Sequence, residues 1–316
     1  MIEMKTILVT CILSLWSVVA ALAQKPGDPR DVGQKWFNIN YAGDTLRGHR
    51  LDIYLPATGD GPFPVIVAIA GSAWFSDNSK PRAYNIGSSL LSQGFAIVAI
   101  NHRSSRKAIF PAQINDVKGA IRFIRANAAK YKLDTSFLGI TGDSSGGHLS
   151  ALAGTSGAIT AFTVGSKTLS IEGNIGGNLN QSSRVDAVVD WYGPTIFQKI
   201  DSCGSSFRHD AKESPESILI GGLIQENDDL CALANPITYI DKNDPAVLII
   251  HGDADNIVPH CQSIFLMREL SAKGVKNELI IVPKGVHGGE ITWQDRNVEK
   301  MIAFFNEARK NKMARN

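Results

Sequence analysis

The sequence lacks the patterns by which metalloproteins and cofactor-dependent enzymes are often recognised. Its 316 residues include only four cysteines, and none of them has the paired spacing of a structural zinc site. There is no His-x-x-x-His pattern, which would place two metal ligands on one face of a helix. No Gly-x-Gly-x-x-Gly turn follows a predicted strand to bind a dinucleotide. We therefore expect neither a metal site nor a cofactor.

The chain also lacks an excess of charge of either sign. The chain has 32 Lys and Arg against 30 Asp and Glu, a net charge of +2, and no long basic run. Proteins that bind nucleic acid usually gather basic residues on one face, so we predict no nucleic-acid partner. Hydrophobic residues make up 44% and charged residues 20% of the chain, a balance typical of a globular protein. Because there is no repeat, low-complexity tract or clear linker, residues 24–316 are predicted to form a single domain.

One long apolar run, over residues 7–20, stands apart from the rest. A lysine precedes it, and the small residues of Ala21-Leu-Ala23 follow before Gln24. This pattern is typical of a secretory signal peptide over residues 1–23, so we expect an exported protein, secreted or periplasmic. The alternative is an uncleaved membrane anchor. No other segment is long and apolar enough to span a bilayer, so no stable membrane insertion is predicted for the remainder.

Three cysteines follow the predicted signal peptide, namely Cys203, Cys231 and Cys261. An oxidising compartment permits disulfides. Because Cys203 and Cys231 bracket a polar stretch, we predict a disulfide between them, which would restrict the unfolded chain. Cys261 is then expected to be free. The alternative is three unpaired, buried thiols.

The pattern of apolar residues predicts an α/β fold. Residues 36–41 and 50–55 alternate between apolar and polar, as in an antiparallel edge pair with one solvated face. Continuous apolar runs, typical of strands covered on both faces, lie at residues 65–70, 95–100, 136–141, 185–189, 246–250 and 278–282. Helical spacing occurs between them, for example over residues 114–124 and 298–305. We therefore expect a mostly parallel, doubly wound sheet with an antiparallel N-terminal edge.

Two segments interrupt this alternation. Residues 155–184 are rich in Gly, Ser, Thr and Asn, and residues 197–235 form a longer polar stretch. Long irregular segments in a compact domain are usually functional loops, so we predict two lid-like insertions. The alternative is that they are tolerated surface insertions.

The stretch from Gly142 to His148 predicts a catalytic turn. It contains Gly-x-Ser-x-Gly, with Ser144 at the centre, between a predicted strand and a helix rich in small residues. This order is the nucleophile elbow, in which a sharp turn projects the serine hydroxyl above the sheet edge. Gly142 and Gly146 leave room for that turn because they lack a Cβ. The alternative is a surface turn with two glycines.

Polar residues after other predicted strands supply partners for Ser144. Ligand sites of open α/β sheets lie at the carboxyl ends of the strands. Asp253 and Asp255 follow the strand at 246–250, and His287 follows the last strand, which gives the order Ser, Asp, His. We predict Ser144 as nucleophile, His287 as general base and acid, and Asp255 as the acid that orients the histidine. Asp253 is the alternative acid, and otherwise stabilises the turn.

An oxyanion hole requires backbone N–H groups near the nucleophile. Ser145, at the start of the helix, is one predicted donor, and Ser72 and Ala73 in the loop after the first long strand are candidates for the second. Trp74 is predicted to form a wall of the substrate pocket, with a packing role as the alternative. His148, four residues after Ser144, is predicted to pack beside the site or line it.

These patterns together resemble the α/β-hydrolase superfamily from about residue 35 onward. More narrowly, the chain resembles the secreted bacterial esterases that include acetylxylan and feruloyl esterases, which are related to hormone-sensitive-lipase-like carboxylesterases. The stretches that carry the resemblance are Phe110–Asp116, Gly142–His148, Asp190–Pro194, Ser214–Ser217, Ala234–Tyr239 and His251–Asp255. The resemblance implies a triad of Ser144, Asp255 and His287 and an oxyanion loop at residues 71–73. Relatives carry His-Gly-Gly-Gly where this chain has Ala70-Gly-Ser-Ala before Trp74.

The function predicted from these observations is that of a secreted serine esterase working through an acyl-enzyme. The resemblance implies a small ester or an acylated polysaccharide as substrate, with short-acyl or feruloyl esters on plant polysaccharide favoured. One alternative is a serine peptidase of the prolyl-oligopeptidase type, although no propeller domain precedes the hydrolase pattern. Others are a lipase, although both insertions are polar, and a binding module without catalysis, although all three triad positions are filled. The sequence makes no prediction about oligomeric state.

Overall fold

The computed structural model describes residues 27–157 and 159–314. The predicted signal peptide lies outside these residues. Within the described part of the chain, no helix is both long enough and apolar enough to cross a membrane.

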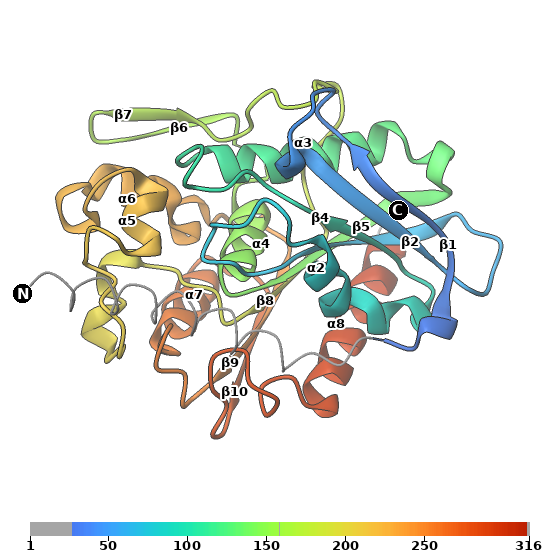
Figure 1. Ribbon diagram of the computed structural model, residues 1–316. Helices are drawn as coiled ribbons and strands as arrows, with labels where there is room; N and C mark the ends of the chain where they lie inside the picture. Colours follow the sequence, from blue (N-terminus) through green and yellow to red (C-terminus); the bar gives the residue numbers. More distant parts are fainter. Residues whose placement is uncertain (1–26, 158, 315–316) are drawn as a thin grey trace, which may run out of the picture.

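The described residues build a mixed sheet of eight strands in the order β1-β2-β4-β3-β5-β8-β9-β10 (Figure 1). The strands are β1 (Val32–Asn40), β2 (Arg50–Pro56), β3 (Phe63–Ile69), β4 (Ala96–Ile100), β5 (Leu133–Asp143), β8 (Ala187–Trp191), β9 (Ala246–Gly252) and β10 (Asn277–Val282). β1 and β2 pair antiparallel, and β2 also runs antiparallel to β4. All pairs from β4 to β10 are parallel. The predicted mostly parallel sheet with an antiparallel N-terminal edge is therefore confirmed.

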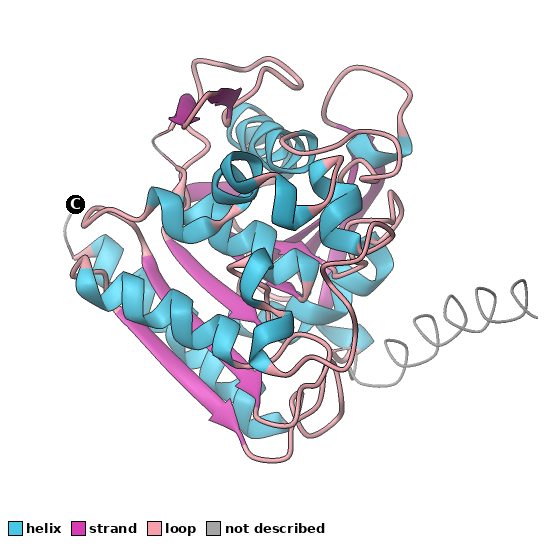
Figure 2. Cartoon of the chain, turned by 90° about the vertical axis from the view of Figure 1, so that its left-hand side faces the viewer, coloured by secondary structure: helices cyan, strands magenta, loops and turns pink. Residues whose placement is uncertain are grey.

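Helices cover both faces of the sheet (Figure 2). The helices of the described residues are α2 (Lys80–Gly87), α3 (Ala112–Ala126), α4 (Ser145–Thr155), α7 (Cys261–Ala272) and α8 (Asp295–Met313), together with α5 (Pro215–Ile220) and α6 (Asp228–Ala234) in the second insertion. The apolar runs of the central strands are continuous because alternate residues enter two cores. Val65 and Val67 of β3 pack with residues of α3, α4 and α7, whereas Ile66 and Ala68 pack with α2 and α8.

The first predicted insertion is fixed on α3. It contains a small hairpin of β6 (Ala161–Val164) and β7 (Lys167–Ser170), seen beside α6 in Figure 1. Arg122 of α3 is buried, and its guanidinium donates to the carbonyl oxygens of Ile175 (3.0 Å) and Gly177 (3.1 Å). The same guanidinium also pairs with the Glu172 carboxylate, so backbone and a charge of the insertion together satisfy it and hold this segment against the helix.

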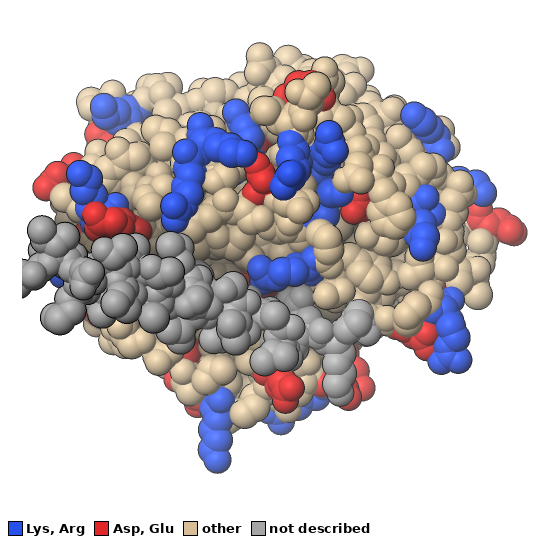
Figure 3. Space-filling view, viewed as in Figure 1, with Lys and Arg blue, Asp and Glu red and all other residues tan. Residues whose placement is uncertain are grey.

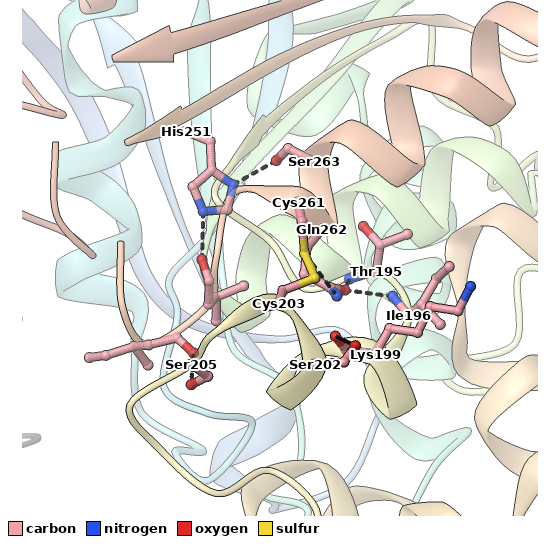
Figure 4. Close-up of a disulfide and its surroundings, with 12 residues drawn as sticks. Thr195, Ile196, Lys199, Ser202, Cys203, Ser205, His251, Cys261, Gln262 and Ser263 are labelled. Carbon is pink, nitrogen blue, oxygen red and sulfur yellow. Dashed lines mark hydrogen bonds between the residues drawn. A yellow bond between two sulfur atoms is a disulfide. The ribbon is translucent and has the colours of Figure 1, made fainter. Parts of the chain in front are cut away.

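The second insertion is joined to α7 by a disulfide that differs from the prediction (Figure 4). Cys203 bonds to Cys261, the first residue of α7, with 6.3 Å between their Cα atoms. Cys231 is unpaired and buried in α6, where its Sγ donates to the carbonyl of Ile224 (3.4 Å). The predicted Cys203–Cys231 bridge is wrong because the Cys231 side chain enters the core, whereas Cys261 meets the insertion from the neighbouring helix. Adjacency of cysteines in the sequence does not reveal this arrangement.

Breaking the Cys203–Cys261 bridge should destabilise the protein. The bridge spans 58 residues of sequence. The chain-entropy model gives about 4 kcal/mol for such a loop. Cys203→Ser should therefore lower Tm by roughly 5–10 °C, and the Tm of this variant should no longer change when reductant is added. Thermal melts with and without dithiothreitol test this, with Cys231→Ser as control, since that variant should respond to reductant like the wild type. A reductant-insensitive Cys231→Ser protein would overturn the pairing.

Charged side chains of both signs are interspersed on the surface. On the face shown in Figure 3, Lys and Arg lie among acidic and neutral residues. Several opposite charges pair, as in the contact of Lys107 with Asp77 at 2.6 Å. Such exposed pairs contribute about 0–1 kcal/mol each, so the stability of this fold rests on its two cores.

Candidate active site

The loop between β5 and α4 holds Ser144 in a strained backbone conformation. Its φ of 52° and ψ of −123° are unusual for a residue with a side chain. The Ser144 N–H donates to the Trp191 carbonyl of β8 (2.8 Å). A Cβ on Gly146 would overlap the carbonyl of Ile69, so the sharp turn needs glycine there. This is the predicted nucleophile elbow, built between two strands and a helix.

Ser144, His287 and Asp255 lie in one hydrogen-bonded chain. His287 Nε2 is 3.0 Å from Ser144 Oγ, and His287 Nδ1 is 2.8 Å from Asp255 Oδ2. The three side chains follow β5, β9 and β10, whose carboxyl ends meet at one edge of the sheet. The structure therefore brings together the three residues that the sequence predicted, at distances suited to proton transfer.

The two aspartates in the loop after β9 differ in burial and in hydrogen-bond partners. Asp255 is buried, and its Oδ1 accepts from the N–H groups of Ile257 (3.0 Å) and Val258 (2.9 Å) while Oδ2 faces His287. Asp253 is exposed, and its Oδ1 accepts from the N–H of Lys284 (2.6 Å). Asp255 is thus placed to orient the histidine, and Asp253 ties two loops together.

His251 supports Asp255 in a way that the sequence does not reveal. Its Nε2 donates to the Val258 carbonyl (2.7 Å) and lies 3.2 Å from Asp255 Oδ2. Its Nδ1 contacts the Ser263 hydroxyl of α7 (2.6 Å), as Figure 4 shows. Since Nε2 donates, the hydroxyl donates to Nδ1 when the imidazole is neutral. His251 therefore fixes the acid loop between β9 and α7.

Electrostatics around the triad favour an ionised aspartate and a basic histidine. Burial alone would raise the pKa of Asp255, but the charge of His287 and hydrogen bonds from both histidines hold that pKa well below its ordinary value. Burial disfavours the charged form of His287, yet the charge and hydrogen bond of Asp255, with a smaller contribution from Asp143, raise the pKa of His287 above 6.5. Asp255 thus stays a carboxylate that stabilises a protonated His287.

The N–H groups of the oxyanion loop can be assigned one by one. Gly71 N–H donates to Asp143 Oδ1 (2.6 Å). Ser72 N–H (2.9 Å) and Trp74 N–H (3.2 Å) both donate to the hydroxyl oxygen of Ser145. Ala73, with a left-handed φ of 53°, lies between them, and its N–H has no acceptor among the described residues.

Two N–H groups are consequently available beside Ser144. One is that of Ala73, and the other is that of Ser145, which as the first residue of α4 has no partner within the helix. Both residues line the same pocket as Ser144. Of the two loop donors predicted, Ser72 is already committed to the Ser145 hydroxyl and Ala73 is free. The Ser145 hydroxyl, which the sequence analysis did not single out, holds the loop on both sides of Ala73.

Trp74 forms part of the pocket wall, and His148 supports it from behind. The Trp74 indole N–H donates to His148 Nδ1 (3.3 Å), and His148 Nε2 donates to the Ala234 carbonyl (2.9 Å). Phe197 packs against both rings. Burial lowers the pKa of His148 to about 4, so its imidazole is neutral. The structure thus places Trp74 at the pocket. His148, which was predicted either to pack beside the site or to line it, packs beside it.

The pocket beside Ser144 is small and partly built by the second insertion. About 240 Å³ of empty space, some of it open to solvent, surrounds the nucleophile. The lining residues are Ala73, Trp74, Ser144, Ser145, Pro194, His209, Pro215, Glu216 and Val258. The insertion provides His209, Pro215 and Glu216. Pro215 and Glu216 belong to a stretch that carries the family resemblance, but no sequence pattern placed any of the three residues at the pocket. The first insertion contributes no lining residue to this pocket.

Comparison with known proteins identifies the family. The family model described as BD-FAE matches residues 51–270. The chain belongs to the BD-FAE family. It is 31% identical over 241 residues to the esterase LipQ of Mycobacterium tuberculosis, an alignment that covers 75% of this chain and 53% of LipQ. The chain spans about half the length of the curated relatives that it matches.

Solved structures of carbohydrate esterases are similar to this BD-FAE chain. A truncated form of a carbohydrate esterase from gut microbiota is 47% identical, covers 90% of this chain and 99% of its own, and superposes with a TM-score of 0.85. The bifunctional GH43-CE protein of Bacteroides eggerthii is 54% identical, with 87% and 35% covered and a TM-score of 0.83. The predicted resemblance to α/β-hydrolase esterases is therefore confirmed.

Proposed function

We propose that this BD-FAE protein is a serine esterase that removes short acyl groups from carbohydrate through an acyl-enzyme. The proposal rests on the hydrogen-bonded chain from Asp255 through His287 to Ser144 beside two available N–H groups. It is supported by the carbohydrate esterases that the chain resembles. The reacting parts of both the acyl group and the alcohol must fit in the small pocket beside Ser144, which favours an acetyl group over a long acyl chain and disfavours the alternative of a lipase.

The mechanism follows from the positions of these groups. His287 Nε2 takes the proton of Ser144 as Oγ attacks the ester carbonyl carbon, and the oxyanion that forms accepts from the N–H groups of Ala73 and Ser145. When the tetrahedral intermediate collapses, His287 gives that proton to the leaving alcohol and the acyl group stays on Ser144. Water, deprotonated by His287, then attacks the acyl carbon; as this second intermediate collapses, the bond to Ser144 Oγ breaks, His287 returns the proton to Oγ, and the acid leaves. Asp255 stabilises the imidazolium in each half of the reaction.

Hydrolysis of a graded set of esters tests the proposal. We expect 4-nitrophenyl acetate to be cleaved with a higher kcat/KM than the butyrate, octanoate or palmitate, and acetate to be released from acetylated xylan. Methyl ferulate in the same set tests a feruloyl substrate. A preference for octanoate or palmitate would contradict the short-acyl proposal. Failure to cleave any ester would contradict the esterase proposal and turn attention to peptide substrates.

We also propose that the protein is exported. The apolar run at residues 7–20 with its small-residue cleavage site supports this, and the Cys203–Cys261 disulfide suits an oxidising compartment. Cell fractionation with N-terminal sequencing of the mature chain provides the test. A cytoplasmic protein that retains residues 1–23 would contradict export.

Removing the Ser145 hydroxyl should impair catalysis without removing a catalytic group. In Ser145→Ala the N–H groups of Ser72 and Trp74 lose their acceptor, so Ala73 between them is held less firmly. We expect kcat for 4-nitrophenyl acetate to fall about tenfold with little change in KM, less than the 100-fold or more that follows loss of an oxyanion donor. Ser150→Ala is the matched control, because the Ser150 hydroxyl bonds only within α4 (2.8 Å to the Gly146 carbonyl). Equal kcat losses in the two variants would contradict a role in positioning the loop.

A further inference from the structure

A buried ion pair forms one side of the pocket beside Ser144. Glu216 and His209, both from the second insertion, are 2% and 1% exposed. His209 Nδ1 is 2.9 Å from Glu216 Oε2, and His209 Nε2 is 2.9 Å from the Ile257 carbonyl. Because both ring nitrogens face acceptors, both carry a proton, and the imidazole is positively charged. Burial opposes this charge, but the hydrogen bond and charge of Glu216 raise the pKa of His209 above its ordinary value.

Only one of the two carboxylate oxygens of Glu216 bonds to His209. Oε2 accepts from His209, whereas Oε1 has no hydrogen-bond partner among the described residues. Glu216 lines the pocket that contains Ser144. A carboxylate oxygen can only accept, and this oxygen belongs to a residue that is 2% exposed and lines the pocket. The pocket therefore presents an acceptor that a hydroxyl or N–H group of a bound molecule can satisfy.

The position of the pair indicates which half of an ester meets this acceptor. The leaving alcohol oxygen receives its proton from His287, so the alcohol half must lie on the histidine side of Ser144. His209 bonds to Ile257, two residues beyond Asp255 in the acid loop. The positive charge of His209 also acts on His287, where it partly offsets the rise in the pKa of His287. The Glu216–His209 pair is thus on the side of the alcohol.

We propose that Glu216 Oε1 accepts a hydrogen bond from a free hydroxyl group on the alcohol half of the ester, and so selects esters of sugars over esters of simple alcohols. The charge of His209 balances that of Glu216, so the site suits a neutral polyol rather than a cationic ligand. The inference rests on the proposed esterase function and adds the residue by which the sugar is chosen. Ser214-Pro-Glu-Ser217, one of the stretches that carried the family resemblance, thereby gains a role.

A cycle of two substrates and two enzymes tests this contact. The substrates are a methyl xyloside monoacetate with a free hydroxyl next to the ester and its deoxy analogue, in which hydrogen replaces that hydroxyl. A hydrogen bond to a charged group contributes about 1.5–3 kcal/mol, so the wild type should prefer the hydroxylated ester by roughly 10- to 100-fold in kcat/KM. In Glu216→Gln we expect that preference to fall to about threefold or less, because the acceptor is neutral.

Two further variants make the result specific. Glu213→Gln changes an exposed glutamate three residues earlier in the same insertion, and should keep the wild-type preference. Glu216→Asp keeps the charge beside His209 but withdraws it from the pocket by one methylene, so it should also lose most of the preference. This variant replaces Glu216→Gln in the test if Glu216→Gln fails to fold. Circular dichroism and thermal melts establish folding.

Each outcome has a distinct meaning. A wild type that cleaves both esters equally, or Glu216 variants that keep the wild-type preference, would overturn the sugar contact while leaving the esterase proposal intact. A wild type that cleaves neither the two xyloside esters nor 4-nitrophenyl acetate would instead contradict the proposed function itself. Loss of the preference in Glu216→Gln or Glu216→Asp, with Glu213→Gln unchanged, supports the contact.

Discussion

Ser144→Ala should lower kcat/KM for 4-nitrophenyl acetate by roughly 10⁴- to 10⁶-fold, the largest effect expected of any single substitution in this protein. In the proposed mechanism this hydroxyl forms the acyl-enzyme, and the neighbouring hydroxyl cannot replace it. The hydroxyl of Ser145, next in the chain, is occupied as acceptor of the Ser72 and Trp74 N–H groups. Activity that remains would come from the oxyanion donors and the pocket acting on a water molecule.

The matched measurements show whether the loss is chemical. Alanine at position 144 adopts the same left-handed backbone at similar cost, so Tm should stay within a few degrees of the wild type. A fluorophosphonate should transfer its phosphonyl group to the wild type, with loss of fluoride, and not to the variant, which mass spectrometry would show. A variant that keeps more than about one hundredth of the activity, or that is still labelled, would show that another residue is the nucleophile.

Asp255→Asn should lower kcat by about 10⁴-fold, the second largest effect expected. An asparagine in this position can donate its amide N–H to His287 Nδ1, which places the imidazole proton on Nε2, where it can no longer accept from Ser144. Asp253→Asn is the matched control, two residues away in the same loop. Its carboxylate bonds only the Lys284 N–H, so we expect a change of threefold or less.

The pH profile of the residual activity gives an independent readout. In the proposed mechanism the neutral form of His287 is the base, so kcat/KM should fall as the pH falls through the pKa of His287. That pKa is raised by Asp255, which places the acid limb of the wild type above pH 6.5. In Asp255→Asn the carboxylate charge is gone while burial remains, so the limb should move to lower pH. An unmoved limb, or a greater loss in Asp253→Asn, would assign the acid to Asp253.

The sheet and the triad could be predicted because they depend on local pattern and strand topology. Strands buried on both faces need continuous apolar residues, and strand ends gather at one edge of a parallel sheet, so residues that follow separate strands can be placed together. Ser144, Asp255 and His287 met in the structure for this reason. The structure places Asp255 rather than Asp253 beside His287, and this distinction depends on which carboxylate is buried.

Other features depend on contacts between segments that carry no periodic pattern. The disulfide partner of Cys203 depended on how the second insertion packs against α7, and the donor of the oxyanion loop depended on where the Ser145 hydroxyl points. Glu216 and His209 lie in an irregular insertion, where neither spacing nor flanking strands mark a functional residue. Their position follows from tertiary packing alone.

The second insertion and the loop that carries Asp255 depend on one another. Ser206 N–H donates to the Asn256 carbonyl (2.7 Å), while Ser205 Oγ (2.9 Å) and His209 Nε2 donate to the Ile257 carbonyl. A chimera that took residues 197–235 from a relative would therefore also replace the scaffold of its own catalytic acid. Such an exchange would succeed only with a segment that brings matching donors and a matching cysteine. On the proposed function, selectivity and catalysis thus depend on the same contacts between the two segments.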